Sequence, residues 1–142
     1  MTVPYFLDTN ILLYAAAGRG TAEAKRKRAR DLIVGARFGI SVQVMQEFYH
    51  NVTRKIARPL SPARALAWIE RLEKLPLVET DRSLVRAGIV VSERYRITYW
   101  DGAMLAAAER LGAPLMYTED LNHGQYYGSV RVINPFVPAP AS

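Results

Sequence analysis

Short apolar runs alternate along the chain with longer segments in which apolar residues recur every three or four positions. The runs have the length of buried strands and lie at residues 3–7, 38–42, 77–79, 115–117 and 130–133. The longer segments have the period of amphipathic helices; they span residues 11–17 and 22–36 or begin near Val42, Pro62, Asp81 and Trp100. Strands that alternate with helices predict an α/β fold, in which a parallel sheet carries helices on both faces.

Residues with known preferences for helix ends divide these segments. We expect Thr21 to cap the helix of residues 22–36, Ser61 to cap the helix that has Pro62 at its first position, and Asp81 to cap the helix that follows. Gly112 is expected to end the helix that begins near Trp100.

The composition restricts the class of protein. With 142 residues, half of them hydrophobic, the chain predicts a single domain over residues 1–135 and a mobile tail over 136–142. It contains no cysteine, which excludes disulfides and cysteine-ligated zinc and agrees with a reducing cytosol. The N-terminal apolar run is interrupted by Asp8 and Asn10, so it is neither a signal peptide nor a membrane span. We therefore expect a cytoplasmic protein.

The net charge of +6 favours a polyanionic partner such as nucleic acid. Much of this charge lies on one face of the segment 22–36, at Lys25, Arg26, Lys27 and Arg28. Two interpretations stay open for this face. It is either a solvated helix surface or a surface that contacts phosphates or a protein partner.

Four acids are predicted to meet within this basic chain. Asp8 and Asp120 follow predicted strands, and the carboxyl ends of parallel strands share one sheet edge. Asp101 opens a helix whose apolar positions three and four residues later face the sheet, and Glu47 borders an apolar helix stripe. Each acid also has a structural interpretation. Asp8 and Asp101 are candidate N-caps, Asp120 a turn residue, and Glu47 an ordinary half-exposed helix residue.

Clustered carboxylates repel one another unless a cation lies between them. All-oxygen ligands suit Mg²⁺ or Mn²⁺ rather than zinc. Such an ion activates water and neutralises charge on a phosphodiester, and two ions about 4 Å apart would hold both the attacking and the leaving oxygen. His50 and His123 lie near these acids in sequence and are either helpers or ordinary polar residues. The chain has no phosphate-binding P-loop, no G-x-S-x-G elbow and no H-E-x-x-H motif.

Taken in order, these motifs resemble the PIN domain, and most closely the VapC-like toxins of bacterial type II toxin–antitoxin systems. The motifs are Asp8-Thr9-Asn10 after the first strand, Glu47 after the second, Trp100-Asp101 at a helix start, and Thr118-Glu119-Asp120 after a later strand. The resemblance extends from Val3 to about Pro135. It implies a three-layer α/β/α sandwich with a short, mostly parallel sheet, and a ribonuclease that depends on Mg²⁺ or Mn²⁺.

The resemblance also implies roles for single residues. The metal-binding acids would be Asp8, Glu47, Asp101 and Asp120, with Asp8 and Asp101 as the core ligands. Thr9 and Thr118 match hydroxyl positions beside the site, and Asn10 matches a polar neighbour of the first acid. Either Glu119 or Asp120 is the fourth acid. We favour Asp120, because the family pattern is a hydroxyl residue, a variable residue and then Asp.

The implied partners are an RNA substrate, a second copy of the chain, and a small cognate antitoxin whose C-terminal segment covers the acidic groove. One alternative is a PIN nuclease of RNA processing or DNA repair. Another is a signalling or interaction module that binds Mg²⁺ without catalysis. A receiver-like module would need an early acidic pair and a late lysine, but Asp8 has no acidic neighbour and no lysine follows Asp101. The presence of all four acids speaks against a degenerate PIN module.

Overall fold

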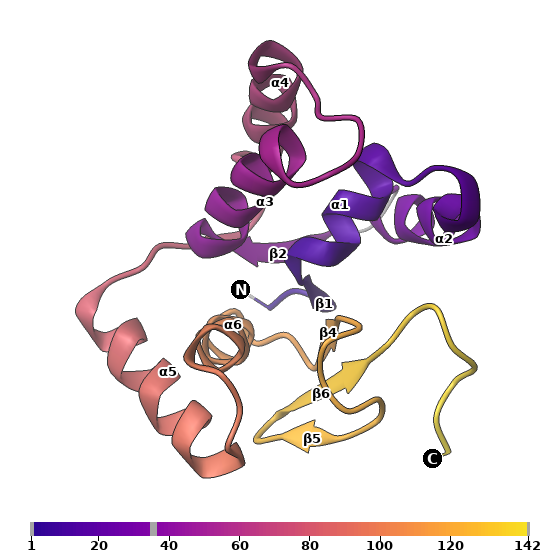
Figure 1. The fold of residues 1–142 in the computed structure, drawn as a ribbon. Coiled ribbons are helices and arrows are strands. Elements are labelled where there is room, and N and C mark those ends of the chain that lie inside the picture. Colours follow the sequence, from indigo (N-terminus) through magenta and orange to yellow (C-terminus); the bar gives the residue numbers. More distant parts are fainter. Residues whose placement is uncertain (1, 35–36, 142) are drawn as a thin grey trace.

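The computed structural model describes residues 2–34 and 37–141, in which helices and strands alternate (Figure 1). The strands are β1 (Tyr5–Leu7), β2 (Phe38–Ser41), β3 (Leu77–Val78), β4 (Leu115–Tyr117), β5 (Tyr126–Tyr127) and β6 (Val130–Ile133). The helices are α1 (Thr9–Ala17), the 3₁₀ turn η1 (Gly20–Ala22), α2 (Glu23–Ile33), α3 (Val42–Arg54), α4 (Pro62–Leu72), α5 (Arg82–Tyr95) and α6 (Tyr99–Arg110).

The strands form one sheet in the order β3-β2-β1-β4-β6-β5. Strand β1 pairs in parallel with β2 on one side and β4 on the other, so that Phe6 lies beside both Gly39 and Met116. Strands β2 and β3, and β4 and β6, are also parallel, whereas β5 is antiparallel to β6. The predicted mostly parallel sheet is confirmed.

Helices cover the sheet on two sides. From β1 the chain moves outward through β2 to β3, then returns past β1 to β4. Because parallel crossovers are right-handed, connections that run in opposite directions place their helices on opposite faces. Figure 1 shows this arrangement: α1 to α4 lie on one side of the sheet, and α5 and α6 lie on the other. This is the α/β/α sandwich that the sequence predicts.

Helix α6 is enclosed between the sheet and α5, and its residues 102–108 are all buried. The two helices approach closely at glycines. A Cβ on Gly102 would lie 2.6 Å from the carbonyl oxygen of Gly88, closer than such atoms approach in proteins. This close packing fixes the start of α6, where Asp101 lies, against the rest of the fold.

The predicted helix ends agree with the structure at α4 and α5 but not at α2. Ser61 and Asp81 cap α4 and α5 as expected. Thr21 does not cap α2, because Gly20, with φ of +59°, turns the chain into η1 and the residue before α2 is Ala22. Helix α2 ends at Ile33, and residues 35 and 36 of the predicted helix lie outside the described residues.

Two C-terminal features were not predicted. Strand β5 follows a polar loop and folds back on β6 through a turn at Gly128, where φ is +63°. The segment after Pro135 contacts the domain at three places. Phe136 packs edge-on against Tyr14, and the carbonyl oxygens of Pro138 and Ala141 accept hydrogen bonds from His123 and Arg131. The mobility of residues 136–142 stays a prediction, and Ser142 lies outside the described residues.

No helix among the described residues combines the length and apolar character needed to cross a membrane.

Candidate metal centre

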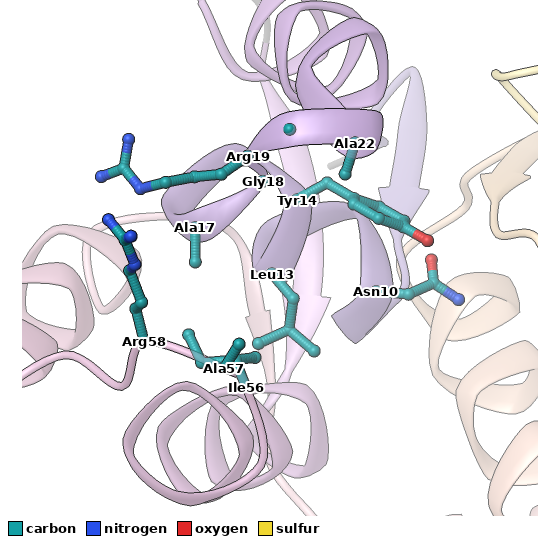
Figure 2. A pocket seen from close by; sticks show the side chains of 11 residues that line it. Asn10, Leu13, Tyr14, Ala17, Gly18, Arg19, Ala22, Ile56, Ala57 and Arg58 are labelled. Atoms are coloured by element: carbon teal, nitrogen blue, oxygen red, sulfur yellow. The ribbon is translucent and has the colours of Figure 1, made fainter.

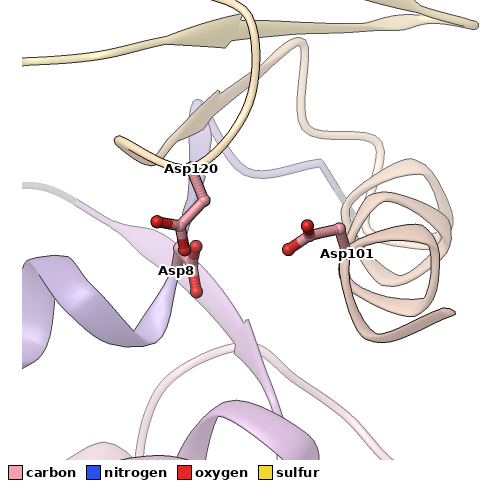
Figure 3. Close-up of side chains that lie close together, drawn as sticks. All are labelled: Asp8, Asp101 and Asp120. Carbon is pink, nitrogen blue, oxygen red and sulfur yellow. The ribbon is translucent and has the colours of Figure 1, made fainter. Parts of the chain in front are cut away.

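Three aspartates meet at the carboxyl ends of β1 and β4. These neighbouring strands lead into connections that run in opposite directions, which opens a crevice at the sheet edge between them. Asp8 follows β1, Asp120 lies in the loop after β4, and Asp101 reaches across from the first turn of α6 (Figure 3). Each offers one carboxylate oxygen, and these oxygens lie within 4.8 Å of one another.

Asp8 is the most constrained of the three. Its side chain is 3% exposed. The backbone N–H of Thr9 donates to Oδ1 at 2.5 Å, and the hydroxyl of Thr118 donates to Oδ2 at 2.6 Å. Asp8 therefore is the N-cap of α1, as its structural interpretation expected, and it also faces the other two aspartates.

The loop after β4 is tied to Asp8 through two side chains. The Thr118 hydroxyl, which donates to Asp8, also accepts from the backbone N–H of Asp120 at 3.1 Å. The amide nitrogen of Asn10 donates to Asp120 at 3.1 Å and more weakly to Asp8 at 3.4 Å. The Oδ1 atom of Asn10 is buried and has no hydrogen-bond partner among the described residues.

Asp101 is not the N-cap of α6, so the interpretation of this residue as a helix cap is wrong. Thr98 is the cap, and its hydroxyl accepts from the backbone N–H of Asp101 at 3.1 Å. Asp101 consequently lies within the first turn, where the exposed N–H groups of a helix stabilise a carboxylate. The cap thus places the Asp101 side chain at the edge of the crevice.

Burial and mutual repulsion oppose ionisation of these acids. Burial raises the pKa of Asp8 to about 7; the hydrogen bond from Thr118 opposes the rise, and the charge of Asp120 adds to it. Burial also raises the pKa of Asp101, and the charges of Asp120 and Glu47 raise it further. The ion pairs found among the described residues involve other acids. A bound cation would supply the missing positive charge.

Glu47 lies outside the group of three clustered carboxylates. Its Oε1 accepts from the Thr9 hydroxyl at 2.9 Å, and its Oε2 accepts from the Gln43 amide at 3.0 Å. The same Gln43 amide donates to the carbonyl oxygen of Trp100 at 3.2 Å, next to Asp101. Glu47 is therefore held beside the cluster, close enough for its charge to raise the pKa of Asp101.

Of the two adjacent acids in the loop after β4, Asp120 joins the cluster and Glu119 does not. The Glu119 carboxylate lies against Lys25 and Tyr14, at 2.9 and 2.5 Å. The histidines are also outside the group of three. His50 is exposed on α3, whereas His123 accepts from the backbone N–H of Asn134 at 2.9 Å and so holds the loop to the chain after β6.

The basic face of α2 is partly used within the protein. Lys25 pairs with Glu119, and Arg26 pairs with Glu23 at 2.9 Å. The Nε atom of Arg28 donates to the carbonyl oxygen of Pro135 at 3.3 Å. The sequence did not indicate these contacts, because two of the three partners are distant in the chain.

A cavity of about 730 Å³ lies beside the aspartates, and sequence reasoning missed it. Its wall is mainly apolar, with Leu13, Ala17 and Ile56 among its residues. Figure 2 has Asn10 at one end of the cavity and the guanidinium groups of Arg19 and Arg58 at the other. The small residues Ala17 and Gly18 at the end of α1 leave this space open. They are the feature of the sequence that could have indicated the cavity.

The donor set fits a hard divalent cation. Three carboxylates from three separate elements converge, and they supply only oxygen ligands, as Mg²⁺ and Mn²⁺ prefer. Glu47 and Thr118 adjoin this group through their hydrogen bonds with Thr9 and Asp8. The arrangement therefore suits chemistry on a phosphate group.

Comparison with known proteins agrees with this architecture. Residues 5–128 match the family model of the PIN domain. A search of curated protein sequences found no match. Among solved structures, a toxin–antitoxin complex from Klebsiella pneumoniae is similar with a TM-score of 0.69 and 15% identity, over 93% of this chain and 98% of that one.

Two further structures are similar over most of their length. VapC20 of Mycobacterium tuberculosis, described as a sarcin–ricin loop cleaving toxin, has a TM-score of 0.63 and 16% identity, over 82% of this chain and 91% of that one. DNA-bound VapBC from Salmonella typhimurium has a TM-score of 0.63 and 19% identity, over 92% of this chain and 97% of that one. At these identities the similarity establishes the fold.

Proposed function

Since this chain belongs to the PIN-domain family, we propose that it is a metal-dependent endoribonuclease that acts as the toxin of a type II toxin–antitoxin pair. The observation that carries the proposal is the convergence of Asp8, Asp101 and Asp120 at the crevice between β1 and β4. In a protein of net charge +6, an acidic centre suits a polyanion, which the overall charge attracts and whose phosphate enters the site.

Asp8, Asp101 and Asp120 would hold Mg²⁺ or Mn²⁺, which would activate water and neutralise charge on the phosphodiester. Thr118 orients Asp8 by donating to it and orients Asp120 by accepting from its N–H. Asn10 spans the same two carboxylates. These bonds hold the oxygens in place before any ligand arrives, which lowers the reorganisation that binding requires.

Glu47 has a separate role in this proposal. Thr9 and Gln43 hold both of its oxygens beside the cluster rather than within it. We assign Glu47 to the attacking water, which it would orient and whose proton it would accept. Asp8, Asp101 and Asp120 would then be the metal ligands, and all four acids expected from the sequence retain a function.

The similar proteins support RNA as substrate and an antitoxin as partner. One is described as cleaving the sarcin–ricin loop, and others are toxin–antitoxin complexes. The cavity beside the aspartates suits an antitoxin segment with apolar side chains and an acidic group, because its wall is apolar and Arg19 and Arg58 lie at its far end. A second copy of the chain would pack on α5, where Val85, Ile89 and Val90 are exposed.

Cleavage of a mixed RNA pool tests the nuclease proposal. The purified protein should cut RNA with Mn²⁺, and it should not cut with EDTA or after Asp8→Asn. Asp81→Asn is the matched control, since Asp81 also caps a helix but is exposed and makes an ion pair with Arg110. Equal cutting of DNA would favour the alternative of a repair nuclease. Cutting in EDTA would contradict the proposal.

The antitoxin proposal has its own test. A cognate antitoxin should inhibit RNA cleavage when it is mixed with this protein. Ala57→Trp places a large side chain at an exposed position of the cavity wall, so inhibition should weaken while cleavage continues. Unchanged inhibition would exclude this cavity as the binding site.

A further inference from the structure

Glu119 lies between Thr118 and Asp120 in the sequence, yet its carboxylate is outside the cluster of aspartates. The Lys25 ammonium is 2.9 Å from Oε2, and the Tyr14 hydroxyl donates to Oε1 at 2.5 Å. Both oxygens of Glu119 are therefore occupied. The side chain is 23% exposed, so these contacts are partly shielded from water.

Lys25 is itself fixed by several groups. Its Nζ lies 3.3 Å from the Tyr14 hydroxyl, 4.9 Å from the centre of the Tyr14 ring and 5.3 Å from the centre of the Phe136 ring. The two rings pack edge-on, with centroids 5.2 Å apart. Aromatic faces attract a cation, so this corner holds the ammonium group in place. We name Lys25, Tyr14 and Glu119 the loop clamp.

Helix α1 connects the loop clamp to the metal centre. Asn10 and Tyr14 are four residues apart on α1 and lie on the same face. Asn10 donates to Asp120, and Tyr14 donates to Glu119. Two consecutive loop acids are thus attached to consecutive turns of one helix, Asp120 at the turn beside Asp8 and Glu119 one turn further along.

We propose that Lys25 and Tyr14 are positioning residues of the metal centre, which hold Glu119 away from the aspartates so that Asp120 is the acid offered to the divalent cation. This inference rests on the metal site of the proposed function. It also gives Lys25 a purpose different from RNA contact, since its charge is already paired with Glu119.

The clamp has an electrostatic consequence that can be measured. In Lys25→Met the Glu119 carboxylate lacks its cation beside a site that attracts divalent ions. One uncompensated charge near the site should lower the Mn²⁺ dissociation constant about three- to tenfold. The rate of RNA cleavage should fall, because Glu119 then competes with Asp120 for the ion.

A second substitution tests whether the effect acts through Glu119, and a control variant tests for a general effect of charge. In Lys25→Met/Glu119→Gln the carboxylate at position 119 is removed as well, so the Mn²⁺ dissociation constant should return to within about twofold of the wild-type value. Lys27→Met is the matched control, because it removes the same charge from an exposed position of the same helix. It should leave the Mn²⁺ dissociation constant unchanged.

The experiment is a Mn²⁺ titration by calorimetry on the full chain, with melting temperatures to verify folding. Tighter binding in Lys25→Met that Glu119→Gln reverses supports the inference. An unchanged dissociation constant in Lys25→Met, or a change that persists in the double variant, overturns it. If the wild type nevertheless binds Mn²⁺ and Asp8→Asn does not, the proposed function is unaffected by that result. Absence of Mn²⁺ binding to the wild type would overturn both.

If Lys25→Met fails to fold, Tyr14→Phe serves as the second variant. It removes the hydroxyl that donates to Glu119 but keeps the ring that packs against Phe136. The same direction of change in the Mn²⁺ dissociation constant is expected, again reversed by Glu119→Gln. Identical constants for wild type and Tyr14→Phe would count against the loop clamp.

Discussion

Burial of the Asp8 carboxylate should destabilise the metal-free protein, and Asp8→Asn should relieve this cost. The pKa of Asp8 is raised from 3.8 to about 7. At a pH between about 4 and 7, the Asp8 carboxyl is therefore protonated in the folded protein and ionised in the unfolded chain. The free energy of unfolding therefore falls as the pH rises from about 4 to about 7, and it stays low above that range. A shift of about 3 units corresponds to about 4 kcal/mol at pH 8.

Part of this gain is offset in the variant. Asparagine is as good an N-cap as aspartate, so α1 keeps its start. The hydrogen bond from Thr118 to a charged acceptor is lost, at a cost of about 1 to 2 kcal/mol. A net gain of about 2 to 3 kcal/mol remains at pH 8. With an unfolding entropy of about 0.3 kcal/mol/K for a chain of this size, the melting temperature should rise by about 7 to 10 °C.

Thermal unfolding in EDTA between pH 4.5 and 8.5 measures this effect. The difference between Asp8→Asn and wild type should grow with pH and level off above pH 7. Mn²⁺ should then raise the melting temperature of the wild type at pH 8 and have little effect on Asp8→Asn. Asp81→Asn serves as the control, because a hydrogen bond from the Leu84 N–H lowers the pKa of Asp81 and its titration lies below this range. A lower melting temperature for Asp8→Asn at pH 8 would refute the reasoning, because it would mean that the charged Asp8 carboxylate stabilises the metal-free protein.

Three further changes should have distinct effects. Thr118→Val removes the hydroxyl that orients Asp8 and accepts from Asp120, so Mn²⁺ affinity should fall about tenfold by calorimetry; unchanged affinity would mean the hydroxyl does not organise the site. Gly102→Ala forces a methyl group against the Gly88 carbonyl and should cost about 2 to 3 kcal/mol in urea unfolding; wild-type stability would contradict the close approach of α5 and α6. Replacement of the four basic residues of α2 by alanine should weaken RNA binding and flatten its salt dependence; these residues are Lys25, Arg26, Lys27 and Arg28. The change in slope should correspond to fewer than four charges, because Lys25 and Arg26 are ion-paired within the protein. An unchanged slope would exclude this face from RNA contact.

The convergence of the aspartates could be predicted from the sequence because it follows from topology. Asp8 and Asp120 come after apolar strands, and parallel strands end at one edge of a sheet. The position of Asp101 could be predicted from the helical period alone, which directs its side chain toward the sheet. The resemblance to the PIN domain, drawn from these same residues, is confirmed by the family match. The alternation of strands and helices was therefore sufficient to predict the fold and the convergence of the three aspartates.

Other features depend on choices that local sequence leaves open. Thr98 and Asp101 are both good N-cap residues, so local sequence does not decide between them, and in the structure the cap is Thr98. The ion pair of Lys25 with Glu119 joins residues 94 positions apart. The helix period alone therefore assigned Lys25 to a face that is either solvated or in contact with phosphates or a protein partner. Strand β5 is two residues long and depends on its pairing with β6, which no local pattern indicates.

The origin of the oxygen at the new RNA end tests the central claim most directly. The wild-type protein is incubated with Mn²⁺ and RNA in ¹⁸O-labelled water, and the cleavage products are analysed by mass spectrometry. Attack by water at the acidic centre predicts one ¹⁸O atom in the phosphate of the new end, no 2′,3′-cyclic phosphate, and no product with EDTA or Asp8→Asn. A 2′,3′-cyclic phosphate, or labelled product that still forms in Asp8→Asn, would contradict a metal-dependent hydrolysis at the three aspartates.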